Sequence, residues 1–219
     1  PVLEWVAAVA ACDLGVGNEN RPQFRGGYEV KVEEVPADIL KELFAACNAQ
    51  VVEAGGYWFP LVGDSGPAVV EINLEDDLLV SEAWQQDPFP GIESTFNGIA
   101  ASHPSPEALW NAKPLETITR TDWVAEDGGT KVFDLNLPMA SSAPQVRQIC
   151  NALLKENRRF RTHKWPMLPE HFFLRPLKTI NATSAEFGYV AKTFRITEMA
   201  YDLRTLTPSV SVRETDPAD

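Results

Sequence analysis

The most constraining feature of this sequence is one stretch, Ala143 to Arg159, in which apolar residues recur at helical spacing. The apolar positions follow the i, i+3, i+4, i+7, i+8 pattern of a helix with one buried face. They are Val146, Ile149, Cys150, Leu153 and Leu154. Pro144 suits a first helical turn, and basic residues gather at the end, where the helix dipole is negative. The sequence therefore predicts a long amphipathic helix whose stripe belongs to a core.

Short strand-like stretches surround this helix. The strands are predicted over residues 24–33, 51–54, 57–61, 69–72, 92–102, 132–137, 160–165, 171–174, 177–182 and 190–199, with Val210 and Val212 pairing across a loop. No strand–helix alternation is long enough for a doubly wound sheet. We therefore predict an α+β fold with short antiparallel β-sheets or small barrel-like lobes and about three helices.

Two further helices are predicted in the N-terminal part, at Leu3–Ala10 and from Pro36 to Cys47. The second carries an apolar stripe that includes Leu43 and Phe44, which we assign to the structural core with the five residues of the long helix. A Gly55-Gly56 pair between two strands predicts a tight hairpin.

The domain expectation is two lobes that divide near a proline-rich break at His103-Pro104-Ser105-Pro106. The first would be a β-rich lobe with two helices over residues 1–102. The second would be a β-rich lobe with the long helix over residues 103–219. Because the chain starts at Pro1 directly in a helical pattern, we expect it to be the truncated start of a larger protein.

Composition argues against several classes of protein. With 31 acidic and 19 basic residues the net charge is -12, so a broad nucleic-acid surface is not expected. The local basic run from Lys155 to Lys164, beside Phe160 and Trp165, fits a helix C-terminus or a protein interface better than a strand-binding groove. No apolar run of about 18 residues is present, so no membrane span is expected. Cys12, Cys47 and Cys150 lie in apolar contexts and are predicted to be packed thiols.

No motif in the sequence assigns chemistry. There is no Gly-x-Ser-x-Gly elbow, and His103, His163 and His171 lack metal-ligand spacing. The acidic run 73–77 lacks the order of a calcium loop and is predicted to be a solvated turn. We therefore predict no catalytic, cofactor-binding or metal-binding residue. An acidic pair for hydrolysis stays open as an alternative, with Glu71, Asp76 and Asp87 unassigned.

The order of short motifs along the chain carries more information than any one of them. In sequence order they are Ala11-Cys12-Asp13, Phe24-Arg25-Gly26-Gly27-Tyr28, Gly55-Gly56-Tyr57-Trp58, Phe96-Asn97-Gly98-Ile99, Trp110, Asp127-Gly128-Gly129, Arg158-Arg159, Thr193-Phe194-Arg195-Ile196 and Val210-Ser211-Val212-Arg213-Glu214. Together they resemble a phage tail protein family. That family includes tail tip and central hub proteins of the phage lambda tip attachment protein J type, with prophage and gene transfer agent relatives. One departure is Arg175-Pro176-Leu177-Lys178, where many relatives carry a Pro-Gly-Asp turn.

The resemblance implies structural work and no cofactor. It implies a baseplate hub fragment of a tail tip that closes the tail tube and links it to the host-recognition fibre. The implied partners are other tail tip and tail tube proteins, and the protein is expected to form a homotrimer in the assembled tail. The resemblance also implies that the protein is made in the bacterial cytoplasm and ends up in the virion tail tip. Candidate interface residues are Leu3, Trp5, Trp58 and Trp84. The alternatives are a tail-associated cell-wall or polysaccharide hydrolase and a cytosolic binding module with a similar α+β architecture.

Overall fold

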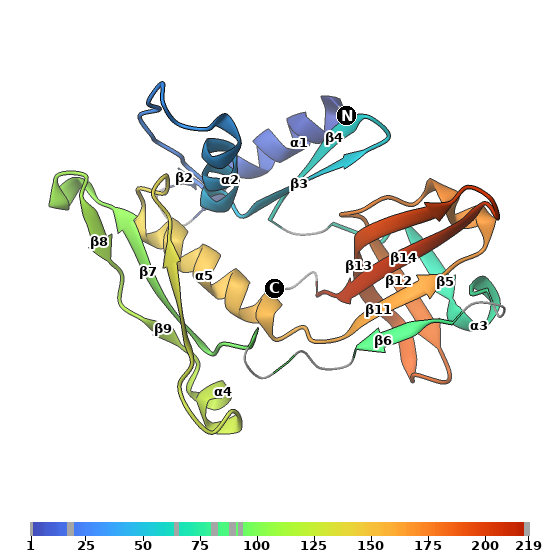
Figure 1. The fold of residues 1–219 in the computed structure, drawn as a ribbon. Helices are drawn as coiled ribbons and strands as arrows, with labels where there is room; N and C mark the ends of the chain where they lie inside the picture. Colours follow the sequence, from blue (N-terminus) through green and yellow to red (C-terminus); the bar gives the residue numbers. More distant parts are fainter. Residues whose placement is uncertain are drawn as a thin grey trace. The chain divides into compact units, whose positions relative to one another are not determined.

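The chain forms two compact units, each assembled from separated segments (Figure 1). The computed structural model describes residues 2–16, 20–63, 66–79, 83–87, 91 and 94–216. Unit 1 comprises Pro1–Glu53, Tyr57–Gly63 and Glu93–Asn157, and unit 2 comprises Ala54–Gly56, Asp64–Ile92 and Arg158–Asp219. The lobe boundary at residues 102 and 103 stays a prediction, and strand β7 (Gly98–Pro104) runs across it.

The predicted α+β class is confirmed. The described residues form five α-helices and several small sheets, and none of these sheets closes on itself. Two pairs of strands are parallel, β7 with β10 and β5 with β12, although the sequence predicted antiparallel pairing.

Unit 1 contains a small sheet against which the long helix α5 (Ala143–Asn157) packs, as Figure 1 shows for α5 and β7. In this sheet β7 pairs with β10 on one side and with β8 and β9 on the other. The remaining elements of the unit are α1 (Val2–Cys12), β1 (Gly15–Val16), β2 (Arg21–Pro22), α2 (Pro36–Ala46), β3 (Ala49–Ala54), β4 (Tyr57–Val62), η2 (Pro106–Ala108), β8 (Ala112–Pro114), β9 (Ile118–Thr119), α4 (Thr121–Glu126) and β10 (Val132–Asn136). The Gly55-Gly56 hairpin is present between β3 and β4, with positive φ at both glycines.

The stripe of α5 supplies much of the unit 1 core. The side chains of Val146, Ile149, Cys150 and Leu154 are buried there, and Leu153 is partly buried and packs against them. Apolar residues at this spacing share one helix face, so they enter one core together.

The assignment of Leu43 to the core is wrong, because its side chain is 41% exposed. Phe44 is only half-buried, and among the residues of α2 only Ala46 is fully buried. The physical reason is the neighbour of Leu43: its Cδ1 lies 3.2 Å from the point where a Cβ on Gly26 would stand. Leu43 thus lies against the loop at Gly26, and a large part of its side chain stays open to solvent.

The strand predicted over residues 24–33 is also wrong. The segment has no regular secondary structure and no partner strand, it turns at residues 32–33, and Tyr28, Val30 and Val32 are exposed. It is fastened by the Gln145 side chain, which accepts from Arg25 N at 3.1 Å and donates to Arg25 O at 3.0 Å. An alternating pattern predicts which residues share a face, but it does not supply a neighbouring strand.

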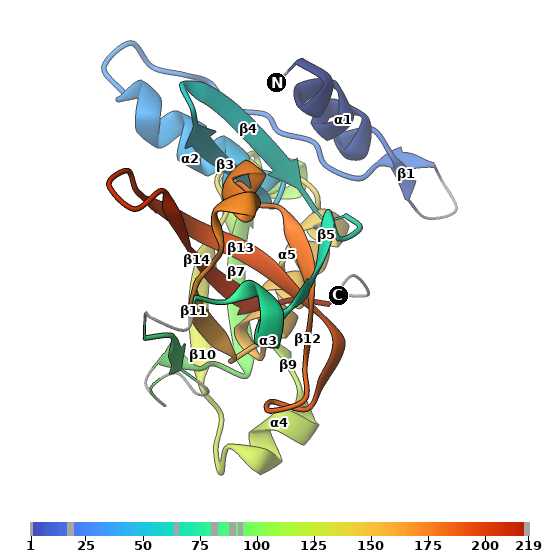
Figure 2. The same ribbon diagram turned by 90° about the vertical axis from the view of Figure 1, so that its right-hand side faces the viewer.

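Unit 2 is built on a six-stranded sheet in the order β5-β12-β13-β14-β11-β6. Its elements are β5 (Val70–Asn73), α3 (Leu74–Asp77), β6 (Gln85–Asp87), β11 (Thr162–Pro166), η3 (Pro169–Phe173), β12 (Thr179–Ser184), β13 (Tyr189–Asp202) and β14 (Thr207–Glu214). Figure 2 shows α3 directly after β5 and close to β12. Its core is centred on fully buried Trp165 and Phe194, whose rings meet edge-on at 5.3 Å.

Two predictions in unit 2 are corrected. The strand predicted over residues 171–174 is absent: residues 171–173 end a 3-10 helix and residue 174 follows it. The helix begins at Pro169, which lacks the N–H group that a strand would donate to its neighbour. The acidic run 73–77 is not a solvated turn: Asn73 ends β5, and residues 74–77 form the helix α3, anchored by the buried side chain of Leu74. Both elements contribute residues to the titratable group described below.

Candidate functional site

An apolar surface on helix α1 and strand β4 is the first candidate site. No residue of α1 is buried, and Leu3 is 82% exposed. The helix packs along β4, where Trp5 Nε1 donates to Trp58 O at 3.0 Å. The Trp58 side chain is itself 59% exposed. We call Leu3, Trp5, Val6, Val9 and Trp58 the α1–β4 surface, and it contains three of the four predicted interface residues.

The fourth predicted interface residue, Trp84, belongs to unit 2. Its ring packs edge-on against Phe187, with centroids 5.0 Å apart, and it is partly exposed. Three of the predicted interface residues therefore lie on unit 1, and the fourth lies on unit 2.

A buried asparagine connects two of the motifs on which the family resemblance rests. Asn97, from the Phe96-Asn97-Gly98-Ile99 motif, donates from Nδ2 to Asp127 Oδ2 at 2.9 Å and to Gly129 O at 2.8 Å. Its Oδ1 accepts from Lys131 N at 2.8 Å. The side chain thus ties the start of β7 to the Asp127-Gly128-Gly129 turn, which gives both motifs a structural purpose.

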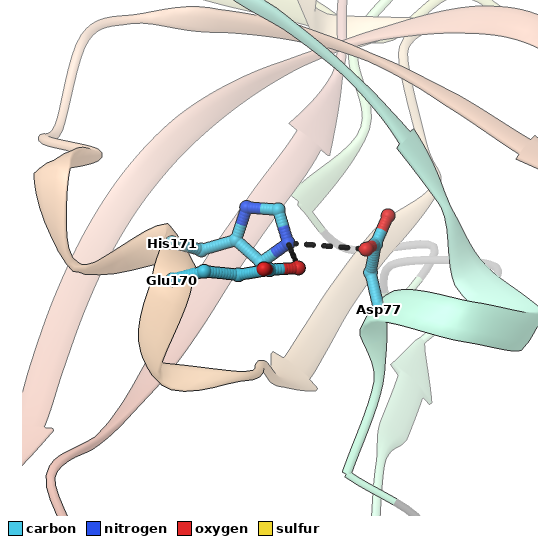
Figure 3. A group of neighbouring side chains, drawn as sticks. All are labelled: Asp77, Glu170 and His171. Atoms are coloured by element: carbon cyan, nitrogen blue, oxygen red, sulfur yellow. Dashed lines mark ion pairs between the residues drawn. The ribbon is translucent and has the colours of Figure 1, made fainter.

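A titratable group in unit 2 is the second candidate site, and we call it the 77/170/171 cluster after Asp77, Glu170 and His171. His171 Nε2 lies 3.3 Å from Asp77 Oδ1 and 3.7 Å from Glu170 Oε1. Figure 3 shows the imidazole directing Nε2 at both carboxylates. Among the described residues this is the group of three His, Cys, Asp or Glu side chains that could hold a metal ion.

Backbone pairing between distant segments builds the cluster. Leu78 and Met167 form an isolated antiparallel bridge, and Leu168 N donates to Asp77 O at 3.1 Å. These bonds bring the end of α3 beside the start of η3. The sequence contained no local signal for this, because Asp77 and His171 are far apart along the chain and neither is part of a spaced motif.

The other predicted titratable residues have ordinary structural surroundings. His103 is buried and its Nδ1 lies 3.0 Å from Pro104 O, while His163 is buried among Trp165, Phe187, Tyr189 and Phe194. Burial raises the pKa of Cys47 and of Cys150 to about 11, so both thiols are protonated near neutral pH. Glu71, Asp76 and Asp87 are exposed on three different elements, β5, α3 and β6.

The basic run has partners that do not favour nucleic-acid binding. Arg158 lies over the Phe160 ring at 5.9 Å, and Arg159 pairs with Asp216 at 3.1 Å. Trp165 is fully buried and cannot stack on a base.

A model of the family described as "Putative phage tail protein" matches residues 36–199, which is well over half of the 219 residues. The chain belongs to this family of phage tail proteins. The confirmed resemblance was drawn from the order of motifs, most of which lie inside the matched range.

Solved structures of two tail proteins and of one chain of a gene transfer agent particle share the fold. A chain of the virion of a native gene transfer agent particle is similar with a TM-score of 0.69 and 15% identity, over 87% of this chain and 41% of that one. The 43 kDa tail protein of prophage MuSo2 from Shewanella oneidensis gives 0.54 and 11%, over 87% and 55%. A tail protein from Neisseria meningitidis MC58 gives 0.54 and 13%, over 90% and 60%.

The chain therefore spans about two fifths to three fifths of the length of these structural relatives. Comparison with curated protein sequences gave no match. Within the described residues, no helix has both the length and the apolar character needed to cross a membrane.

Proposed function

We propose that this chain is a structural part of a tail tip, a piece of the baseplate hub that closes the tail tube and links it to the host-recognition fibre. The observation that carries the proposal is the shared fold with a chain of the gene transfer agent virion, over 87% of this chain. Family membership supports a location in the virion tail, and hub position is the finer step that we add.

The proposed partners are other tail tip and tail tube proteins and two further copies of the same protein, in a homotrimer. The α1–β4 surface supports this part of the proposal. Exposed apolar area of this kind is unfavourable in water and typical of surfaces that assemble. Trp84 is a second proposed contact, on unit 2. The protein would be made in the bacterial cytoplasm and incorporated during tail assembly.

A structural role is favoured over hydrolysis. The acids Glu71, Asp76 and Asp87 are exposed on separate elements. The groove beside the start of α5 is lined by Arg21, Arg25, Lys113 and Arg147 against two acids, Glu107 and Glu116. Neither arrangement resembles the facing carboxylate pair of a glycoside hydrolase. A cell-wall zymogram should therefore show no clearing, and clearing that disappears when one of these acids is replaced would favour the hydrolase.

The experiment for the hub role uses the full-length protein in a strain that assembles tails. Trp58→Ala should reduce the number of assembled tails seen by electron microscopy, because it removes the exposed ring of the proposed interface. Trp110→Ala is the matched control, since Trp110 is also an exposed tryptophan of unit 1 but lies outside the α1–β4 surface. Tail numbers that stay at the wild-type level in both variants would remove the surface from the proposal. Particles that assemble normally without the protein would overturn the hub role itself.

A further inference from the structure

We propose that Asp77, Glu170 and His171 bind one divalent transition-metal cation, with zinc as the best-matched ion. The chemical class follows from the donor set. An imidazole nitrogen with two carboxylate oxygens suits zinc and its neighbours in the first transition row, whereas magnesium and calcium prefer sites made of oxygen alone.

The state of His171 supports a bound cation. His171 is 6% exposed, and neither of its ring nitrogens makes a hydrogen bond. A buried polar group without a hydrogen bond is costly, so such a group in a folded protein requires an explanation. Here Nε2 is directed at two carboxylates at ion-pair distance without hydrogen-bond geometry to either. A cation between the three groups would give Nε2 and both carboxylates a common partner.

The spacing of the donor atoms also suits a metal ion. Tetrahedral zinc with bonds of about 2.0 to 2.2 Å holds its ligand atoms about 3.3 to 3.6 Å apart. The separations of 3.3 Å to Asp77 Oδ1 and 3.7 Å to Glu170 Oε1 are close to this range. All three donor atoms lie within 4.8 Å of one another.

The ligand side chains are held in a way that permits binding. Asp77 is 18% exposed at its side chain, and its Oδ2 accepts from Asn73 N at 2.7 Å, which leaves Oδ1 directed toward the histidine. Glu170 has a 67% exposed side chain and can rotate toward the ion without disturbing the core. Two of the ligands would be fixed and one adjustable. Three protein ligands leave the fourth coordination position of zinc open to water.

Binding would crosslink α3 to η3, two elements joined by the Leu78–Met167 bridge. The site would therefore act on the stability of unit 2, since an ion that binds only the folded state adds to its free energy of unfolding. This consequence does not depend on the role of the protein in the tail.

The test uses the whole chain, freed of metal with a chelator and titrated with zinc chloride by calorimetry. We expect one tight equivalent per chain and a higher melting temperature with zinc. Glu170→Gln should weaken this binding at least ten-fold without altering the fold, because Glu170 is exposed. Glu198→Gln is the matched control, an exposed glutamate on β13 outside the cluster, and should bind zinc like the wild type.

Two results would overturn the site. One is the absence of a tight zinc equivalent in the wild-type chain. The other is equal binding by the Glu170→Gln and Glu198→Gln variants, which would assign any bound zinc to thiols or to the general surface. In either case the cluster is an ion pair between His171 and Asp77 and holds no metal.

Discussion

At the scale of single residues, Asn97 has the most consequential side chain among the family motifs. It is fully buried and uses both ends of its amide to bind the Asp127–Lys131 region. An amide is well suited to this position, because it offers donors and an acceptor together, whereas a carboxylate or an alkyl group lacks one or both.

Replacing Asn97 by alanine should lower the free energy of unfolding by about 2 kcal/mol or more, because Lys131 N and Gly129 O lose their buried partner. Chemical denaturation measures this. Asn151→Ala is the control, since Asn151 makes only an exposed bond to Arg147 O within α5. Similar losses in the two variants would contradict the importance assigned to Asn97.

His163 is a second residue with a measurable consequence. Its ring is stacked on Trp165 and approaches the Tyr189 hydroxyl at 3.1 Å. Burial lowers its pKa from 6.5 to about 4, and the positive charges of Arg161 and Lys192 act in the same direction. The folded protein therefore holds this imidazole neutral at pH values where the unfolded chain binds a proton.

The stability that depends on His163 should be fully present above about pH 6.5 and lost as the pH falls toward about 4. The full loss is about 3 kcal/mol at 1.36 kcal/mol per pKa unit. Carboxylates titrate in the same range, so the measurement is the difference in pH dependence between the wild type and His163→Gln. Parallel stability curves for the two proteins would mean that the loss of stability at low pH does not come from the protonation of His163.

At the scale of elements, the packing of α5 on the sheet of unit 1 allows a test of which helix face is buried. Leu154 is fully buried, whereas its neighbour Leu153 is only partly buried. Leu154→Ala should cost about 2 to 5 kcal/mol of stability through lost burial and the cavity left behind. Leu153→Ala should cost less in the same thermal or urea unfolding experiment. An equal cost at both positions, or a larger one at Leu153, would mean that the buried face is rotated from the one described.

The elements that could be predicted are those whose pattern is local. The stripe of α5 and the Gly55-Gly56 hairpin depend on neighbours within a few residues, and both are present. Strand β10 forms as well, but Val132 and Phe133 are both exposed on it. The segment 24–33 has the same kind of pattern but lacks a partner strand, which only tertiary structure provides. The strand predicted over residues 190–199 does not keep one buried face, because the ladder between β12 and β13 shifts register. Val190 is exposed, whereas Phe194, an even number of residues further along the strand, is buried.

At the scale of the whole molecule, the two units are interleaved along the chain, because each is assembled from separated segments. The 77/170/171 cluster could not be predicted for the same reason: α3 and η3 are brought together by a long-range bridge. The apolar character of Leu3 and Trp5 was evident from the sequence. Their exposure depends on how α1 packs along β4, and that required the structure.

The family was recognisable before the fold because its motifs mark turns and hydrogen-bonded positions in a fixed order, as Asn97 and the Asp127-Gly128-Gly129 turn illustrate. The hub role rests on that family membership together with the shared fold.

The most direct test of the hub role is a cryo-electron microscopy reconstruction of the tail tip from particles that contain the full-length protein. We predict density for both units at the end of the tail tube, in three copies around the tube axis, with the α1–β4 surface covered by a neighbouring chain. Density for this fold found only along the tube wall, or a tip that lacks it, would contradict the proposal.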